Sequence, residues 1–178
     1  MSIYANIAPT PQTGGLFYSQ GMVIPAAEGE LGNQPGSLAP PIATLYGQAI
    51  TAIIELSTVG AVLTNSTYVV MQTDLGDGVW IDLAWCTWTG TGTAKFCLAD
   101  GMDGANSFQV RTQGVAPTPA NGSNQMPLGG RIRFVGKSTV TTAAASSSSS
   151  AKAASSSAAP AVTPGVLATI KYLLLGLR

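Results

Sequence analysis

The stretch that decides the fold spans residues 68–99 and reads YVVMQTDLGDGVWIDLAWCTWTGTGTAKFCLA. Apolar residues recur in it at alternate positions, and two glycine-containing loops, at 74–78 and 90–93, divide it into three segments. Alternation with a period of two is typical of strands that bury one face. We therefore predict three antiparallel strands that follow one another in a meander.

The apolar residues of all three strands must lie on the same face of the sheet, and this requirement restricts how the strands can pair. The first loop should pair residue 73 with 79, so that 71 meets 81, and the second should pair 85 with 98, so that 86 meets 97. Trp80 and Trp88 then share the mixed face, which either contacts a partner or is covered by a second sheet. The predicted apolar face contains Val69, Met71, Ile81, Leu83, Trp85, Phe96 and Leu98.

This register places Cys86 opposite Cys97 and Trp88 opposite Lys95. A disulfide is one reading of the cysteine pair. We favour two reduced thiols, because no secretory context is visible and a bond between directly facing strand residues is strained. The tryptophan and lysine could form a cation–π contact.

The segments that flank the meander are less clear. Residues 42–56 have apolar positions at helical spacing but are also rich in β-branched residues, and we lean towards a helix. A strand is expected at 107–111, followed by a loop over 114–130. Residues 131–135 alternate basic and apolar side chains, so Arg131 and Arg133 should lie on one face of a strand, where they could bind carboxylates of a neighbouring subunit.

The two ends of the chain differ from its middle. Residues 1–41 are rich in Gly and Pro and predict an extended arm with one or two short strands. Residues 143–159 comprise eight Ala, eight Ser and Lys152, a composition typical of a flexible linker. An apolar segment follows it. We favour a strand there over a short helix opened by Thr163 and Pro164, and expect it either to anchor in a neighbour or to fold back on its own domain.

The sequence as a whole predicts a mainly β protein, an antiparallel β-sandwich or barrel-like domain. We divide it into an extended N-terminal arm at 1–41, a β-rich core at 42–137, an Ala/Ser/Pro-rich linker at 138–165 and a C-terminal hydrophobic anchor strand at 166–178. The candidate interface residues are Trp80, Trp88, Arg131, Arg133, Ile170, Tyr172, Leu173, Leu174 and Leu175.

Composition argues against catalysis. The chain has no histidine, and 9% of its residues are charged, against about 25% in a typical soluble domain. No phosphate loop, nucleophile elbow or zinc spacing occurs, so we expect no enzyme activity, cofactor or metal. The basic residues are dispersed and no apolar run reaches the roughly 18 residues of a membrane span, so neither nucleic acid nor membrane is an expected partner.

The few charges are unevenly distributed. Residues 1–94 contain six acids and no Lys or Arg, whereas residues 95–178 contain all eight bases and two acids. Opposite charges attract, so this polarity has two interpretations: one subunit's acidic face meets a neighbour's basic face, or the two parts neutralise each other within one subunit.

Low charge, a turn-rich β core, an irregular arm, an Ala/Ser tract and an apolar C-terminal segment together resemble the small virion structural proteins of tailed bacteriophages, most closely the capsid decoration (cement) proteins. The resemblance implies a homo-oligomer, often a trimer. It implies that the oligomer is assembled in the host cytoplasm and binds the major capsid protein between capsomers on the capsid surface. Two alternatives are another head-fibre or tail component and a carbohydrate-binding β-sandwich with Trp80, Trp88 and Tyr68 as its platform.

Overall fold

The computed structural model describes residues 17–18, 21–31, 42–43, 49–74, 76, 78–99, 111–124, 131–142 and 162–175. Residues 17–18, 42–43, 49 and 173–175 are described by their backbone. The predicted strand at 107–111, except Arg111, and the Ala/Ser tract at 143–159 lie outside the described residues.

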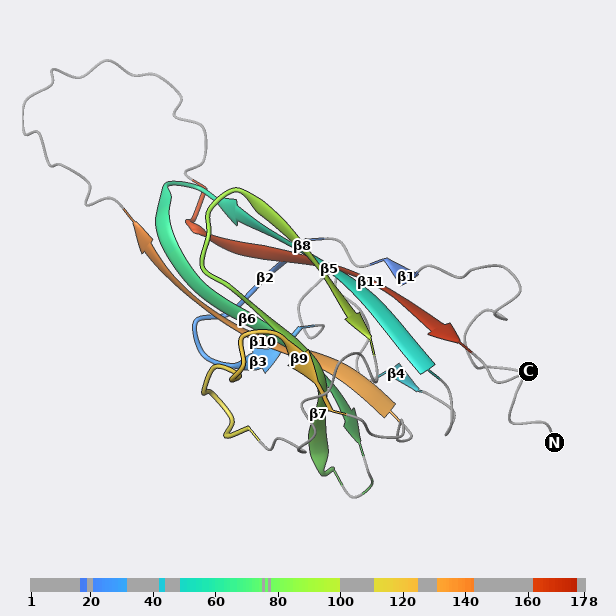
Figure 1. Ribbon diagram of the computed structural model, residues 1–178. Coiled ribbons are helices and arrows are strands. Elements are labelled where there is room, and N and C mark those ends of the chain that lie inside the picture. Colours follow the sequence, from blue (N-terminus) through green and yellow to red (C-terminus); the bar gives the residue numbers. More distant parts are fainter. Residues whose placement is uncertain are drawn as a thin grey trace, which may run out of the picture.

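The strands form two antiparallel sheets that pack against each other (Figure 1). The β5 sheet has five strands in the order β1-β11-β5-β8, and β2 also pairs with β11. The β6 sheet has six strands in the order β3-β10-β6-β7-β9, and β4 also pairs with β10. The predicted β-sandwich is confirmed. The barrel-like alternative is wrong, because the strands form two sheets and not one closed one. No helix occurs among the described residues.

The bounds of the strands in the β5 sheet are β1 (Phe17–Tyr18), β2 (Met22–Val23), β5 (Ala49–Val59), β8 (Thr93–Ala99) and β11 (Gly165–Leu175). Those in the β6 sheet are β3 (Gly29–Glu30), β4 (Ile42–Ala43), β6 (Val62–Asp74), β7 (Trp80–Trp88), β9 (Gly122–Ser123) and β10 (Arg131–Thr142).

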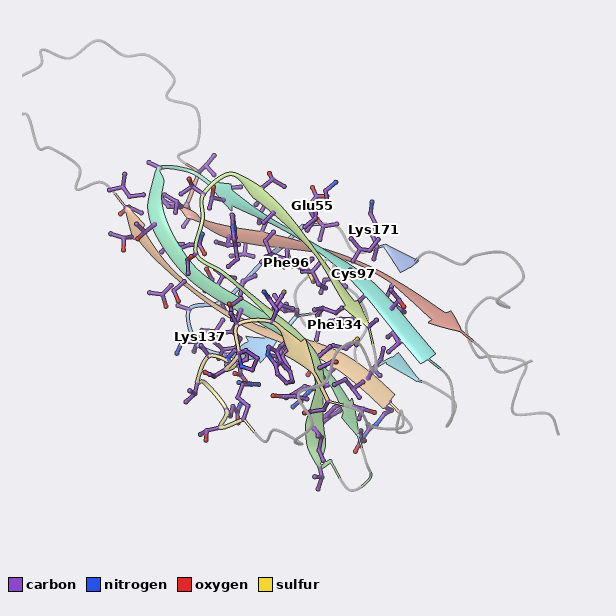
Figure 2. The ribbon with its side chains drawn as sticks, in the orientation of Figure 1. Glu55, Phe96, Cys97, Phe134, Lys137 and Lys171 are labelled. Carbon is purple, nitrogen blue, oxygen red and sulfur yellow. The ribbon has the colours of Figure 1, made fainter. Side chains whose placement is uncertain are left out.

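Side-chain alternation builds the core between the sheets. Over residues 50–56 of β5 and 166–172 of β11 every second side chain is buried, and those between are partly or fully exposed. Phe134 of β10 lies 6.2 Å from Tyr172 of β11 between ring centroids, so the two sheets meet there (Figure 2). Each large aliphatic side chain buried in this layer contributes roughly 1.5–3 kcal/mol. The buried set on β5 and β11 is Ile50, Ala52, Ile54, Leu56, Val166, Ala168, Ile170 and Tyr172.

The helix expected over 42–56 is wrong. This segment contains β4 and most of β5, and β5 pairs along its length with β11 on one side and with β8 on the other. Its apolar residues fit a helical period in part, but the β-branched residues and two long ladders of backbone hydrogen bonds favour a strand. The spacing of residues within one segment cannot predict those ladders, because the strands that pair with β5 lie far from it in the sequence.

The hairpin of β6 and β7 is confirmed, but its register differs from the prediction. Thr73 pairs with Ile81, two positions beyond the expected residue 79. The loop between the strands is longer because Val79 donates to the Gly76 carbonyl at 3.0 Å and the Gly76 amide donates to Asp74 at 2.8 Å. Both bonds lie inside the first pair of the hairpin, which joins Asp74 to Trp80.

A β-bulge then shifts the register of this hairpin again. Gln72 pairs with Asp82 but Met71 pairs with Ala84, so Leu83 is the extra residue. Leu83 and Ala84 are both buried in the core, and the alternation inverts beyond them. Trp85 therefore lies in a small cluster on the outer face of the β6 sheet, whereas Trp88 packs against the core.

The third predicted strand, β8, does not continue the meander. It crosses to the other sheet and pairs with β5, so that Cys97 faces Ile53 and Lys95 faces Glu55. Cys86 instead faces Val69 of β6, and both cysteines are free thiols. The expected Cys86–Cys97 and Trp88–Lys95 neighbours are therefore wrong, whereas reduced cysteines are confirmed. Phe96 and Leu98 still face the core, but from the opposite sheet.

The segment 21–31 crosses one side of the sandwich from sheet to sheet. The Ile24 amide donates to Val166 of β11 at 2.9 Å, and the Leu31 amide donates to Phe134 of β10 at 2.8 Å. Met22, Ile24 and Leu31 join the core. Part of the predicted N-terminal arm is thus bound to both sheets.

The C-terminal segment is a strand, as we favoured over a helix. β11 pairs with β5 on one side and with β1 and β2 on the other, all in the same chain. The alternative in which this segment folds back on its own domain therefore describes the structure.

Gly136 allows the 21–31 segment to approach β10. A Cβ there would lie 3.1 Å from the Tyr68 carbonyl oxygen, 3.0 Å from Leu31 Cδ1 and 3.3 Å from Ile24 Cγ2. We expect Gly136→Ala to lower the free energy of unfolding in urea by about 1–3 kcal/mol through overpacking. The control is Gly21→Ala, whose Cβ would lie 3.6 Å from its nearest neighbour, an ordinary contact. Equal losses at the two positions would contradict this explanation.

Candidate functional site: a buried ion cluster and groove on the β6 sheet

The outer face of the β6 sheet holds a buried cluster of charges. Arg111 leads into the 111–124 loop and contacts Glu28 of the 21–31 segment and, at 2.9 Å, Asp82 of β7. The three side chains are 8%, 5% and 7% exposed, respectively. One guanidinium therefore joins two covering segments to the sheet beneath them.

Tyr68 of β6 forms the floor of this cluster. Its hydroxyl donates to Glu28 at 2.5 Å, and the Arg111 guanidinium lies 5.4 Å from the centre of its ring. The Gly114 amide also donates to Glu28, at 2.9 Å. Burial raises the pKa of the Glu28 carboxyl, but the hydrogen bonds from Arg111, Tyr68 and Gly114 outweigh it and hold that pKa below its usual value. Burial and the neighbouring Glu28 raise the pKa of Tyr68.

A second group of polar side chains extends this cluster along the sheet. Gln72 donates to Asp82 at 2.6 Å and accepts from Arg133 at 2.8 Å, which connects the two groups. The Arg133 guanidinium lies 4.2 Å from the ring centre of Trp80, and that of Arg131 lies 5.6 Å from it. This indole is stacked by one arginine and flanked by another.

The carboxylates of this second group are also paired. Arg131 hydrogen-bonds to Asp74, which holds the pKa of that carboxyl below its usual value. Arg133 lies 4.0 Å from Glu30, and burial lowers the pKa of Arg133.

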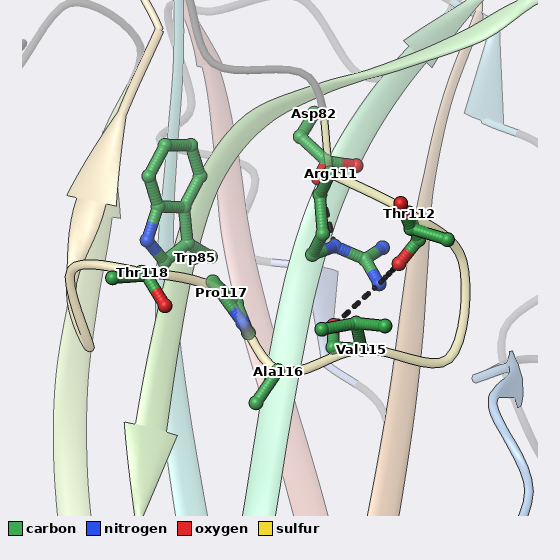
Figure 3. A pocket seen from close by; sticks show the side chains of 8 residues that line it. All are labelled: Asp82, Trp85, Arg111, Thr112, Val115, Ala116, Pro117 and Thr118. Carbon is green, nitrogen blue, oxygen red and sulfur yellow. Dashed lines mark hydrogen bonds and ion pairs between the residues drawn. The ribbon is translucent and has the colours of Figure 1, made fainter.

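Two cavities open beside these residues. A groove of about 410 Å³ is lined by Trp80, Gln72, Arg133 and the Asp82–Arg111 pair. A smaller cavity of about 210 Å³ lies under the 111–124 loop, where Arg111 donates to the Val115 carbonyl at 3.1 Å (Figure 3). Trp85 donates to the Pro119 carbonyl at 2.8 Å and supports the loop from below. The groove combines an aromatic wall with fixed hydrogen-bonding groups, an arrangement suited to a polar ligand.

The structure brings some of the predicted interface residues together and separates others. Trp80, Arg131 and Arg133 gather on the outer face of the β6 sheet. Trp88 lies on the opposite face and packs against the core, because the bulge inverts the alternation. The predicted platform of Trp80, Trp88 and Tyr68 is therefore wrong. Tyr68 is buried under Glu28, and of the three aromatic residues only Trp80 lines the groove.

The C-terminal candidates lie within the chain's own sheet. Ile170 and Tyr172 are buried in the core of their own chain. The backbone of residues 173–175 pairs with β5, and their side chains lie outside the described part. These residues support the sandwich itself.

Sequence reasoning missed the buried cluster of Glu28, Asp82 and Arg111. One signal was present, since Asp82 is a single charge between Ile81 and Leu83, and a buried carboxylate needs a cation. Its partner could not be identified, because Arg111 lies 29 positions away and also binds Glu28, 83 positions away.

Every ion pair among the described residues joins an acid from the first part of the chain to a base from the second. The pairs are Glu28–Arg111, Asp82–Arg111, Asp74–Arg131, Glu30–Arg133 and Glu55–Lys95. The interpretation that the charge polarity is neutralised within one subunit is confirmed for these residues. Arg131 and Arg133 accordingly bind carboxylates of their own chain.

Across the described ranges, no three His, Cys, Asp or Glu side chains come together as a metal site would require. The same part of the chain has no helix long and apolar enough to span a membrane. Comparisons with protein-family models, curated proteins and solved structures found no match to this chain.

Among the polar residues that the structure describes, Arg111 should cause the largest loss of stability when it is replaced. Arg111→Ala leaves Glu28 and Asp82 buried without their cation, and we expect a loss of about 3–5 kcal/mol in the free energy of unfolding. The control is Lys95→Ala, which removes an ion pair whose side chains are 67% and 38% exposed and should cost about 0–1 kcal/mol. Urea denaturation measures both. Similar losses would show that the buried cluster has no special role.

The cluster should also make stability depend on acid pH. The folded pKa of Glu28 lies below its ordinary value of 4.5, so the unfolded chain binds a proton first as pH falls. The stabilisation is fully present above that ordinary value and is lost as pH falls through the folded pKa. We expect the urea concentration at the unfolding midpoint to decrease as the pH is lowered below 4.5. In Glu28→Gln this decrease with pH should be less steep. Identical pH profiles in wild type and variant would contradict this.

Proposed function

We propose that this chain is a non-enzymatic structural subunit of a bacteriophage particle, where it decorates and stabilises the capsid shell from its outer surface. It binds the major capsid protein between capsomers as one copy among many. The observation that carries this proposal is the outer face of the β5 sheet, on which no described side chain is buried and which offers a broad and weakly charged surface for contact.

This outer face is formed by the residues of β5, β8 and β11 that alternate with the buried ones. None of the described side chains on it is buried, and Ile53 at its centre is 44% exposed. Glu55, Cys97 and Lys171 lie on this side of the molecule, away from Phe134 in the core (Figure 2). The outer face of the β6 sheet, in contrast, is covered by the 111–124 loop and its ion cluster.

The charges on this face suit docking on another protein. Glu55 and Lys95 already form an ion pair at 3.1 Å, so their desolvation on contact is partly compensated. Their neighbours on this face are mostly small, hydroxylated or aliphatic, with Lys171 as a further cation beside Ile53. A standard interface buries roughly 800 Å² on each partner, and many copies on one shell would add their separate contributions.

The test uses Ile53→Asp and particles that lack this protein. Adding a buried carboxylate to the interface is unfavourable, so we expect occupancy on the particles to fall at least about tenfold. Leu63→Asp is the matched control, since Leu63 of β6 is 58% exposed and lies in the other sheet. Occupancy is measured by imaging the particles and by quantifying bound protein.

If wild type never binds particles, the proposal is wrong. If both variants bind like wild type, the β5-sheet face is not the contact. Deleting the C-terminal segment is not a suitable alternative test, because it would remove β11 from the middle of the sheet.

The groove beside Trp80 supports a second candidate, a carbohydrate-binding sandwich. An indole wall with Gln72, Asp82 and Arg133 around it matches the aromatic and hydrogen-bonding groups that polyols need. A soluble monomer that binds glycans through Trp80 and leaves particles bare would favour this candidate over decoration.

A further inference from the structure

We propose that the free edge of β8 pairs with β8 of a second copy of this chain, in antiparallel orientation about a two-fold axis at Phe96. The inference rests on the proposed role as an assembling subunit, because it identifies one contact through which copies join. It concerns the edge of the β5 sheet and not its outer face.

The hydrogen-bonding direction of each β8 residue follows from its register with β5. The Thr58 amide donates to Gly92 at 2.9 Å, and these two residues continue the ladder that pairs Ser57 with Thr93. Hydrogen-bonded and non-hydrogen-bonded pairs alternate in an antiparallel ladder. Even-numbered residues of β8 therefore bond to β5, and odd-numbered residues direct their N–H and C=O groups away from it.

The outward-directed residues are Thr93, Lys95, Cys97 and Ala99, and their outward backbone groups have no partner in the described part of the chain. An unpaired row of this kind is a template for another strand. Proteins commonly protect such edges with proline, a bulge or a free lysine. β8 contains no proline, its ladder with β5 has no register shift, and Lys95 is held by Glu55.

A two-fold axis at Phe96 brings the outward-directed residues of one β8 opposite the outward-directed residues of the other. All seven residues of β8 then pair, with Thr93 opposite Ala99 of the second copy and Lys95 opposite Cys97 of the second copy. The two lysines avoid each other, and each keeps its own Glu55. An axis at Lys95 would oppose like charges, and an axis at Cys97 would pair fewer residues.

Among the described residues, a groove lies beside this edge of the sandwich. A groove of about 250 Å³ opens between β8 and β9 and is lined by Phe96, Leu98, Cys86 and Gly122. In the two-fold arrangement Phe96 of each copy faces the other beside this groove. The apolar contact adds to the backbone hydrogen bonds, and the side-chain register, with Phe96 facing Phe96 and Lys95 facing Cys97, suits a copy of the same strand.

The test changes the residue opposite Lys95 in the full-length chain. Cys97→Glu places a carboxylate opposite Lys95 of the second copy at two sites per dimer, and Cys97→Lys places a like charge there. We expect the first to tighten and the second to weaken dimerisation, each by roughly 2- to 30-fold in dissociation constant. Sedimentation equilibrium under reducing conditions measures this. Leu63→Glu and Leu63→Lys, on an exposed position of β6, are matched controls that should change nothing.

A second readout uses the native thiols. The exposed Cys97 residues of two paired copies would be diagonal neighbours, within reach of a short bismaleimide. Cys86 should not react, because it is buried and burial raises its pKa to about 12. The expected product is a covalent dimer that is absent from Cys97→Ser.

Monomers at all concentrations up to about 1 mM, or effects of the same sign in Cys97→Glu and Cys97→Lys, would overturn the pairing. Thermal unfolding shows whether each variant is folded. A monomer that still binds particles overturns this contact alone, whereas a dimer that never binds them overturns the proposed function alone.

Discussion

The pairing of β11 with β5 is the interaction on which the rest of the structure depends. It joins residues 165–175 to residues 49–59 through an uninterrupted ladder of eleven pairs. β1 and β2 attach to the other edge of β11, and Ile24 donates a further bond to Val166. Without β11, the β5 sheet would retain β5 and β8, and the inward side chains of β6 and β10 would lose the layer that covers them.

The Arg111 cluster serves a different purpose. It supplies little apolar burial, but it holds the 21–31 segment and the 111–124 loop against the outer face of the β6 sheet. Three buried charges are costly unless each is satisfied, and here Tyr68 and Gly114 add hydrogen bonds to the ion pairs. Part of one outer face of the sandwich is consequently closed by polar contacts, whereas no described side chain on the outer face of the β5 sheet is buried.

Alternation of apolar and polar residues predicts where strands occur, but not which strands pair. Period-two alternation correctly identified β6, β7, β8 and the start of β10 as strands, whereas β11 was favoured as a strand because it is an apolar segment after a linker. It did not distinguish neighbours in one sheet from strands in opposite sheets, because Phe96 and Leu98 can face the core from either side. A single extra residue at Leu83 was enough to move Trp85 and Trp88 to faces opposite those expected. Among the candidate interface residues, Trp80 of β7 lies beside Arg131 and Arg133 of β10 across the intervening β6, a contact that only the order of strands in the sheet decides.

The sequence by itself determined that this protein is mainly β with few charges, since alternation, turn glycines and composition are local properties, but it left a sandwich and a barrel-like domain open. It also determined that acids and bases lie in different parts of the chain, so any ion pair between those parts must be long-range. The tertiary structure alone decided which sheet β8 joins, that β11 pairs within its own sandwich, and which carboxylates Arg111 and Arg131 neutralise. The physical reason is that a strand's faces follow from its own residues, whereas its neighbours depend on backbone ladders and side-chain contacts between residues far apart in the chain.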